Sequence, residues 1–333
     1  MWSIANRTPY AAKGTWGRGR DGIHEWIVAV KGTFDIRPDG RLVLADEAPE
    51  PLLCPQYHGE AGRSSLRYEA DLVGQKPATD IIVNGTAYAP KGHPSTAFLA
   101  SLRIGQIYKE IKVIGNRRWT RGLFGNISSP EPVVQVPIVY ERAYGGFDDS
   151  EPEPRQQRMD PRNPVGCGLR KQAEDPLPNF EYPGKSLDKA GPAGFGAIAS
   201  YWSPRRELSG TYDEAWRQSR FPLLPQDWDL RALLCAPEDQ RQATYLQGGE
   251  LVELTNLTPD GVLRFELPKV GLIYRTEFSM GFGARPLTDT GHLISVIIEP
   301  DYPRLILVWS STLPCRQDGD YLEETVVREV RPH

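Results

Sequence analysis

Cysteine and long apolar runs are scarce in this 333-residue sequence, and neither sign of charge is in large excess. Its four cysteines stand far apart, at Cys54, Cys167, Cys235 and Cys315. This spacing suits neither a zinc knuckle nor a redox pair, so it predicts isolated thiols in a reducing compartment. Cys54 lies four residues from His58, but no second pair completes a metal site, and none is expected.

The formal net charge is -4 and the isoelectric point is near 5.8. Proteins that bind nucleic acids usually carry a basic excess, so nucleic acid is not an expected partner. No stretch approaches the roughly 20 apolar residues of a membrane helix, and residues 1–9 lack the apolar run of a signal peptide. We therefore expect a cytoplasmic protein without a membrane partner.

Glycine and proline are plentiful, with 32 and 30 copies, and both disfavour helix interiors. Hydrophobic residues make up 39% of the chain, which is enough for a real core. The composition therefore predicts a mainly β fold of antiparallel, sandwich-like sheets, with one or two short helices and long loops.

Runs of β-branched and aromatic residues between turn signals predict the strands. They are expected at 25–36, 42–44, 80–87, 96–104, 107–114, 133–140, 251–254, 262–267, 271–278, 292–298 and 305–309. Residues 251–278 read as one meander, and the last two strands as a pair. A short helix is expected at 213–219, and a second is expected to start at Pro237 and end before Gly248.

Residues 148–200 are polar and broken by proline, so they predict a loop-rich excursion. We expect one β-rich domain over residues 1–333 that carries this excursion. Two lobes, 1–147 and 201–333, are the alternative.

No sequence motif predicts catalysis. Residues 17–22 spell G-x-G-x-x-G, but a strand follows them where a dinucleotide site needs a helix. The acid pairs Asp148-Asp149 and Glu238-Asp239 lie in a charged loop and a helix first turn, which is typical of solvated carboxylates. We therefore expect no catalytic residue, no cofactor and no enzymatic activity.

Several tryptophans lie outside the predicted strands. Trp26 and Trp309 fall in apolar strands and are expected in the core, whereas Trp202, Trp216 and Trp228 lie in loop-rich sequence. Aromatic and arginine side chains anchor protein interfaces, so these three tryptophans and Arg205 are candidate partner contacts. The same aromatics leave a carbohydrate-binding module open as an alternative, and a hydrolase of unfamiliar architecture is a second one.

A series of short phrases runs through the chain in order. The phrases are VKGTF at 30–34, KPATD at 76–80, GTAYAP at 85–90, GNRRW at 115–119, YERAYGG at 140–146, RNPVG at 162–166, LPN at 177–179, PAGFG at 192–196, WSPR at 202–205, GTYD at 210–213 and APEDQR at 236–241. Together they resemble a bacterial family of unknown function whose genes tend to accompany type VI secretion spikes.

The resemblance implies an adaptor or chaperone that binds a toxin effector and helps load it on a VgrG-type spike protein. It attaches no catalytic motif to the chain. The family-motif positions are expected to be mostly structural, because glycine and proline usually mark backbone geometry. They are Glu141, Arg142, Tyr144, Gly145, Gly146, Asn163, Pro164 and Gly166. Contacts specific to one partner are expected in loops such as 148–158.

Overall fold

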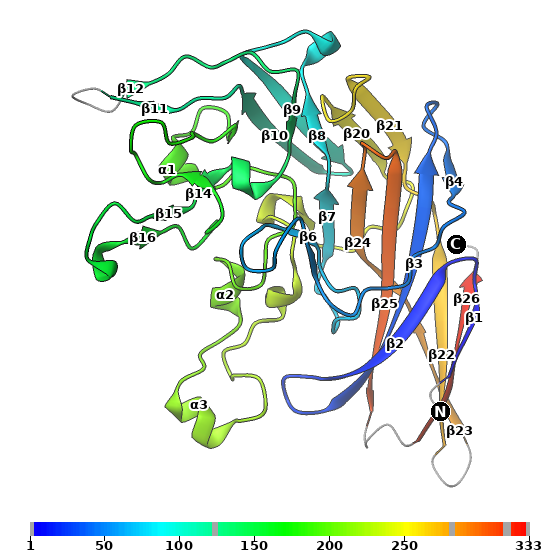
Figure 1. The fold of residues 1–333 in the computed structure, drawn as a ribbon. Coiled ribbons are helices and arrows are strands. Elements are labelled where there is room, and N and C mark those ends of the chain that lie inside the picture. The colour runs from blue at the N-terminus through cyan, green and yellow to red at the C-terminus, as the bar shows by residue number, and fades with distance from the viewer. Residues whose placement is uncertain (1–2, 122–125, 280–283, 316–320, 331–333) are drawn as a thin grey trace.

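The computed structural model describes residues 3–121, 126–279, 284–315 and 321–330. The fold is mainly β, with several mostly antiparallel sheets and a few short helices (Figure 1), which confirms the predicted class. No helix in the described ranges is long and apolar enough to cross a membrane.

A seven-stranded sheet forms the centre of the molecule. Its strands pair antiparallel, apart from the parallel pair of β7 and β24. In spatial order they are β19 (Arg241–Gln242), β7 (Thr79–Val83), β24 (His292–Glu299), β25 (Arg304–Cys315), β3 (His24–Ile36) and β2 (Ala11–Arg18), with β4 (Leu42–Leu44) also on β3. β3 and β25 pair from His24 opposite Cys315 to Asp35 opposite Arg304.

This sheet is buried on both faces. On β3, Trp26, Val28 and Val30 point into one apolar cluster, while Ile27 and Ala29 point into another. A strand buried on both faces needs apolar residues at successive positions, so it shows a continuous apolar run and little alternation. The run Trp26–Val30 has this pattern, and all five residues are buried.

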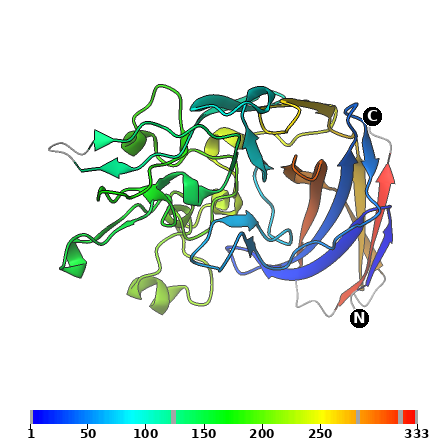
Figure 2. The same cartoon turned by 45° about the horizontal axis from the view of Figure 1, so that its top comes forward.

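The inner face of the central sheet shares one core with two further sheets (Figure 2). The five-stranded sheet contains β18 (Phe180–Glu181), β10 (Ile107–Ile114), β9 (Ala97–Ile104), β20 (Leu251–Thr255) and β21 (Val262–Glu266). The four-stranded sheet contains β1 (Ser3–Arg7), β26 (Leu322–Val330), β22 (Gly271–Ser279) and β23 (Ala284–Thr290). Leu102, Val252 and Tyr274 bring both into contact with the core.

The outer face of the central sheet is covered by the mid-chain segment. Tyr140, Ala197 and Trp202 pack there with Ile294 and Ile306 of the sheet. The remaining strands form short ladders: β5 (Gln56–Tyr57) with β6 (Leu66–Tyr68), β8 (Thr86–Tyr88) with β13 (Gln135–Pro137), β11 (Trp119–Thr120) with β12 (Asn126–Ile127), β14 (Tyr144–Gly145) with β17 (Cys167–Gly168), and β15 (Phe147–Asp148) with β16 (Arg158–Met159).

The helices are all short and lie mostly in the same mid-chain segment. They are α1 (Leu187–Ala190), α2 (Arg205–Leu208), α3 (Glu214–Ser219), and the 3-10 turns η1 (Pro90–Gly92), η2 (Tyr140–Arg142), η3 (Pro154–Gln156), η4 (Leu230–Leu233) and η5 (Glu238–Gln240). At α3 the Asp213 side chain accepts the backbone N–H of Trp216, which caps the helix and confirms the element predicted at 213–219.

Four element predictions are wrong in whole or in part. The strand expected at 80–87 breaks at Asn84-Gly85 between β7 and β8, and only Gln135–Pro137 of the strand expected at 133–140 is extended as β13. The helix expected from Pro237 is only the single turn η5, because the chain then pairs Arg241 with Asp80 as strand β19. The expected meander also breaks after β21, since β22 leaves for the four-stranded sheet and pairs with β23 and β26. Strands β2 and β26 were not foreseen. The pair expected at 292–309 is confirmed as β24 and β25.

Candidate functional site

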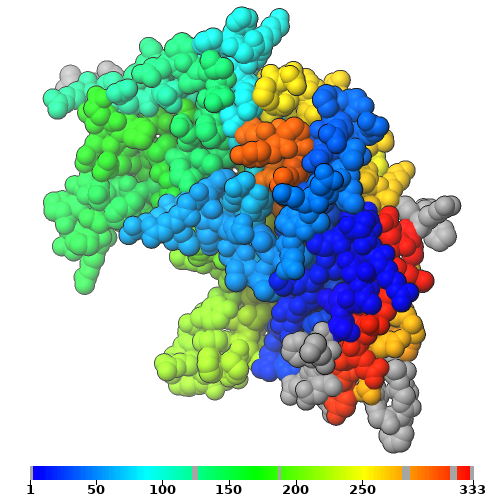
Figure 3. Space-filling model, turned by 45° about the vertical axis from the view of Figure 1, so that its right-hand side comes forward, coloured from blue at the N-terminus to red at the C-terminus, as the bar shows by residue number. Residues whose placement is uncertain are grey.

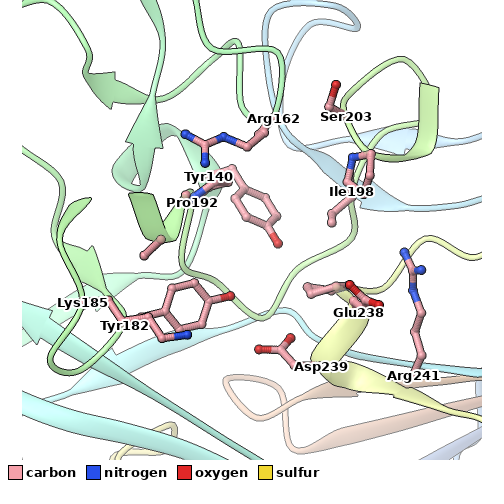
Figure 4. Close-up of a pocket in the computed structure, with 14 residues that line it drawn as sticks. Tyr140, Arg162, Tyr182, Lys185, Pro192, Ile198, Ser203, Glu238, Asp239 and Arg241 are labelled. Atoms are coloured by element: carbon pink, nitrogen blue, oxygen red, sulfur yellow. The ribbon is translucent and has the colours of Figure 1, made fainter. Parts of the chain in front are cut away.

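A pocket of about 490 Å³ opens between the mid-chain segment and η5 (Figure 4). Its size falls in the range of small-molecule sites. Figure 4 shows the hydroxyls of Tyr140 and Tyr182 pointing toward the open space, opposite Glu238 and Asp239. We call this the tyrosine pocket. Five of the phrases that carry the resemblance contribute to its wall: YERAYGG, RNPVG, PAGFG, WSPR and APEDQR.

A buried lysine lies behind the acidic side of the tyrosine pocket. Lys109 on β10 donates to Asp239 at 2.8 Å and to the Gln240 side chain at 2.7 Å. Burial lowers the pKa of Lys109 to about 8, although Asp239 acts in the opposite direction. Burial, and then the nearby Asp239 carboxylate, raise the pKa of Tyr182. At neutral pH Tyr182 therefore keeps its proton beside the Asp239 carboxylate, while the Tyr140 hydroxyl donates to the carbonyl of Gly196 at 3.2 Å.

The cations of the tyrosine pocket are partly matched. Arg162 lies against Asp160, with its Nη2 at 2.6 Å from the carboxylate. Arg241 donates from Nε to the carbonyl of Ala236, while its Nη2 is buried and finds no hydrogen-bond partner in the part of the chain that the structure describes. The lining thus carries both signs of charge and suits a polar ligand with both donors and acceptors.

A second pocket, of about 460 Å³, lies where three segments meet: the loop after β10, the turn η2 and residues 176–179. Arg117, Arg118 and Arg142 all line it, together with Glu141 and Glu174. We call this the arginine pocket. The phrases GNRRW, YERAYGG and LPN supply most of its wall.

Asn163 organises the backbone beside this second pocket. It is fully buried, and its Nδ2 donates to the carbonyls of Tyr140 and Tyr144 at 2.7 and 3.0 Å. A side chain at Gly166 would come within 2.3 Å of that amide nitrogen, so close approach requires glycine there. Gly146 adopts φ +97°, which favours glycine. These positions maintain the turn geometry.

The other family-motif positions also make internal contacts. Glu141 accepts from the backbone N–H and the hydroxyl of Ser65, both at 2.7 Å. Tyr144 is buried and forms β14 with Gly145, and Pro164 follows Asn163 in the same turn and is partly exposed. Glu141 and Arg142 also line the arginine pocket.

The structure places two of the four candidate partner contacts in the interior. Trp202 is fully buried and meets the Tyr140 ring edge to face, with centroids 5.7 Å apart. Arg205 forms an ion pair with Glu69 at 2.7 Å and donates to the carbonyls of Ile198 and Ala232. Their sequence neighbours gave no sign of this burial. Neither side chain lies at the surface, where a partner could contact it.

Trp216 lies in an exposed aromatic cluster. Its ring meets Tyr212 and Phe221 edge to face, with centroids 4.8 and 5.7 Å apart. Tyr212 is 54% exposed and Phe221 66% exposed. The lobe that carries α3 stands out from the body (Figure 3). Trp228, in the same lobe, is partly exposed. Three aromatics within ten residues were a signal that sequence reasoning used only for Trp216.

The loop at 148–158 forms a small hairpin, β15 with β16, around η3. Asp148 accepts from Ser150 and from Arg158, at 2.5 and 2.8 Å. Across the described ranges, no three His, Cys, Asp or Glu side chains gather as metal ligands would.

The comparisons with known proteins agree with this bacterial resemblance at a coarse level. No curated protein and no solved structure matches the chain. One family model does, described as "Uncharacterized protein conserved in bacteria (DUF2169)", over residues 21–310. That range runs from just before β3 into β25 and includes both pockets and the aromatic cluster. The chain therefore belongs to the DUF2169 family of bacterial proteins.

Proposed function

We propose that this protein is a type VI secretion adaptor that binds a toxin effector in the cytoplasm and helps load it on a VgrG-type spike. The proposal rests on the resemblance described above and on one structural observation. That observation is the exposed aromatic cluster of Tyr212, Trp216 and Phe221.

Aromatic side chains at the centre of an interface supply much of the binding energy, and exposed apolar patches often mark such interfaces. The cluster is held in place before any partner arrives. The Trp216 indole donates to the carbonyl of Leu223 at 2.9 Å, and Arg220 donates to the carbonyl of Arg20 in the turn between β2 and β3. A rigid anchor loses less conformational entropy on binding.

The expected mechanism is stoichiometric. The adaptor covers an apolar surface of the effector, which keeps the effector soluble until the spike offers a better site. No covalent step is needed, and each adaptor acts on one client at a time.

The test is co-expression with the neighbouring effector and spike, followed by co-purification. We expect the effector to be soluble only with the adaptor. The double variant Tyr212→Ala/Phe221→Ala is expected to weaken effector binding by about tenfold or more, the range of interface anchors. Tyr302→Ala is the matched control, because Tyr302 is 68% exposed in the turn between β24 and β25. An effector that is soluble alone and never co-purifies would overturn the proposal.

Glycan binding stays a second candidate, and the tyrosine pocket favours it. Tyrosine rings with carboxylate and guanidinium groups are suited to stacking on sugars and to bonding their hydroxyls. A saturable isotherm with one glycan, lost in Tyr182→Ala, would support this function. A flat response across a glycan array would remove it.

A further inference from the structure

The arginine pocket contains donors that the fold does not use. Arg117 donates from Nη2 to Glu181 and to the carbonyl of Pro178, but its Nε is buried and has no hydrogen-bond partner among the described residues. Buried donors without partners are uncommon in proteins and often mark the place of a missing water or ion. One lining residue of the pocket, Arg117, therefore carries a donor that the described residues do not satisfy.

The charges around the pocket are unequally matched. Arg117 has Glu181 at 2.6 Å, and Arg118 has Glu131 and Glu174 at 3.4 and 3.0 Å. Arg142 makes one side-chain bond, from Nη1 to the Asn179 carbonyl oxygen at 3.0 Å. Within the described part of the chain, no carboxylate lies within 4.0 Å of the Arg142 guanidinium.

The carboxylates that do line the pocket leave Arg142 unmatched. Both oxygens of Glu141 accept from Ser65, and the Glu174 side chain is 72% exposed beside Arg118. The Cys167 thiol does not compete as an anion, because burial raises its pKa to about 11. Arg142 therefore has no ion-pair partner among the described residues, although the Glu141 carboxylate lines the same pocket.

We propose that the arginine pocket binds one carboxylate group, held by the guanidinium of Arg142 with help from Arg117. A guanidinium matches a carboxylate in shape and can form two parallel hydrogen bonds with it. One unmatched cation suits a singly charged group, since a phosphate dianion would bring a second charge close to Glu141 and Glu174. The inference does not depend on the proposed adaptor function.

The carboxylate has two sources, a free organic acid or the end of a polypeptide, and the experiment separates them. Calorimetric titration of the full chain would use an alanine hexapeptide with a free C-terminal carboxylate, its C-terminal amide and the monocarboxylate butyrate. We expect the free-acid peptide or butyrate to bind, and the amide to bind at least tenfold more weakly than its acid. Binding of butyrate alone would assign a free acid as the ligand.

The variants address Arg142 directly. Arg142→Gln is expected to weaken binding at least tenfold. Arg142→Lys keeps the charge but loses the planar fork, so it is expected to weaken binding by a smaller factor. Arg41→Gln is the matched control, because the Arg41 side chain is 73% exposed in the turn before β4. Should Arg142→Gln fail to fold, Arg142→Lys still gives the measurement. Equal binding of acid and amide, no binding of either probe, or full binding by the Arg142 variants would overturn the inference.

Discussion

Asp80 links the central sheet to the segment that covers it. Its carboxylate accepts from Lys76 at 2.9 Å and from the backbone N–H groups of Cys235 and Ala236, also at 2.9 Å. Lys76 and Asp80 are both at most 1% exposed. Burial alone would raise the pKa of Asp80, but Lys76 and the two amides hold it below its ordinary value.

Replacing this carboxylate is expected to be costly. Asp80→Asn leaves the Lys76 cation buried without its counter-charge, a change that typically costs about 3–5 kcal/mol. Urea denaturation at pH 7 measures it, with Asp39→Asn as control, since the Asp39 side chain is 66% exposed. A loss below about 1 kcal/mol would contradict this role of the Asp80 carboxylate.

Because the folded pKa of Asp80 is lowered, the stabilisation from Asp80 is present above pH 4 and is lost as pH falls further.

Lys109 predicts a further rise in stability with pH, in the alkaline range. Its folded pKa is about 8, whereas an unfolded lysine titrates near 10.4. Between these values the unfolded chain binds more protons, so stability rises with pH. The free energy of unfolding of the wild type, minus that of Lys109→Met, should rise by on the order of 3 kcal/mol from pH 8 to 10.5. Parallel pH profiles for the two proteins would rule this out.

At the scale of elements, the turn after β14 gives a strong test of backbone geometry. A Cβ at Gly146 would lie 2.3 Å from the carbonyl oxygen of Gly166, whereas at Gly261, with φ +81°, it would meet nothing within 4 Å. Gly261→Ala should therefore cost only the conformational term, about 1 kcal/mol. Gly146→Ala should cost about 2 kcal/mol more, measured by thermal unfolding. Equal losses would mean that the backbone relaxes freely.

Most strands could be predicted from sequence because the residues that indicate a strand lie within it and at its ends. β10 and β4 match their expected bounds, since β-branched runs between turn residues need no distant partner to be recognised. Which strands pair with one another could not be predicted in this way. Nothing near β22 indicates that it pairs with β26, and η5 stops where Arg241 meets Asp80, whose position in the sheet no local pattern reveals.

Only part of the candidate site could be predicted, because burial and pocket lining also depend on residues that are distant in the sequence. The short helix predicted at 213–219 is present as α3, and Trp216 on it was named in advance as an aromatic outside the predicted strands. Trp202 looked equally free in sequence, yet distant strands bury it. Arg142 showed no sign of its pocket, because the residues that surround it come from three separate segments.

On the scale of the whole molecule, one sheet supports two cores. Val28 faces the inner cluster and Ile27 the outer one, so neither core persists without the same strands. We expect far-ultraviolet and near-ultraviolet circular dichroism to report one coincident thermal transition. Trp202→Ala should lower its midpoint without separating the two curves. Two resolved transitions would show that the mid-chain segment unfolds by itself.

The pairing of β3 with β25 has a consequence for synthesis. A ribosome makes residues 24–36 long before residues 304–315, yet each strand is the other's neighbour along its length. The same holds for β1 and β26. Until β25 is made, β3 can pair with its sequence neighbours β2 and β4 but not with the strand that adjoins it over most of its length, and such non-local topologies fold slowly. We therefore expect the nascent chain of this proposed adaptor to bind chaperones itself during its synthesis.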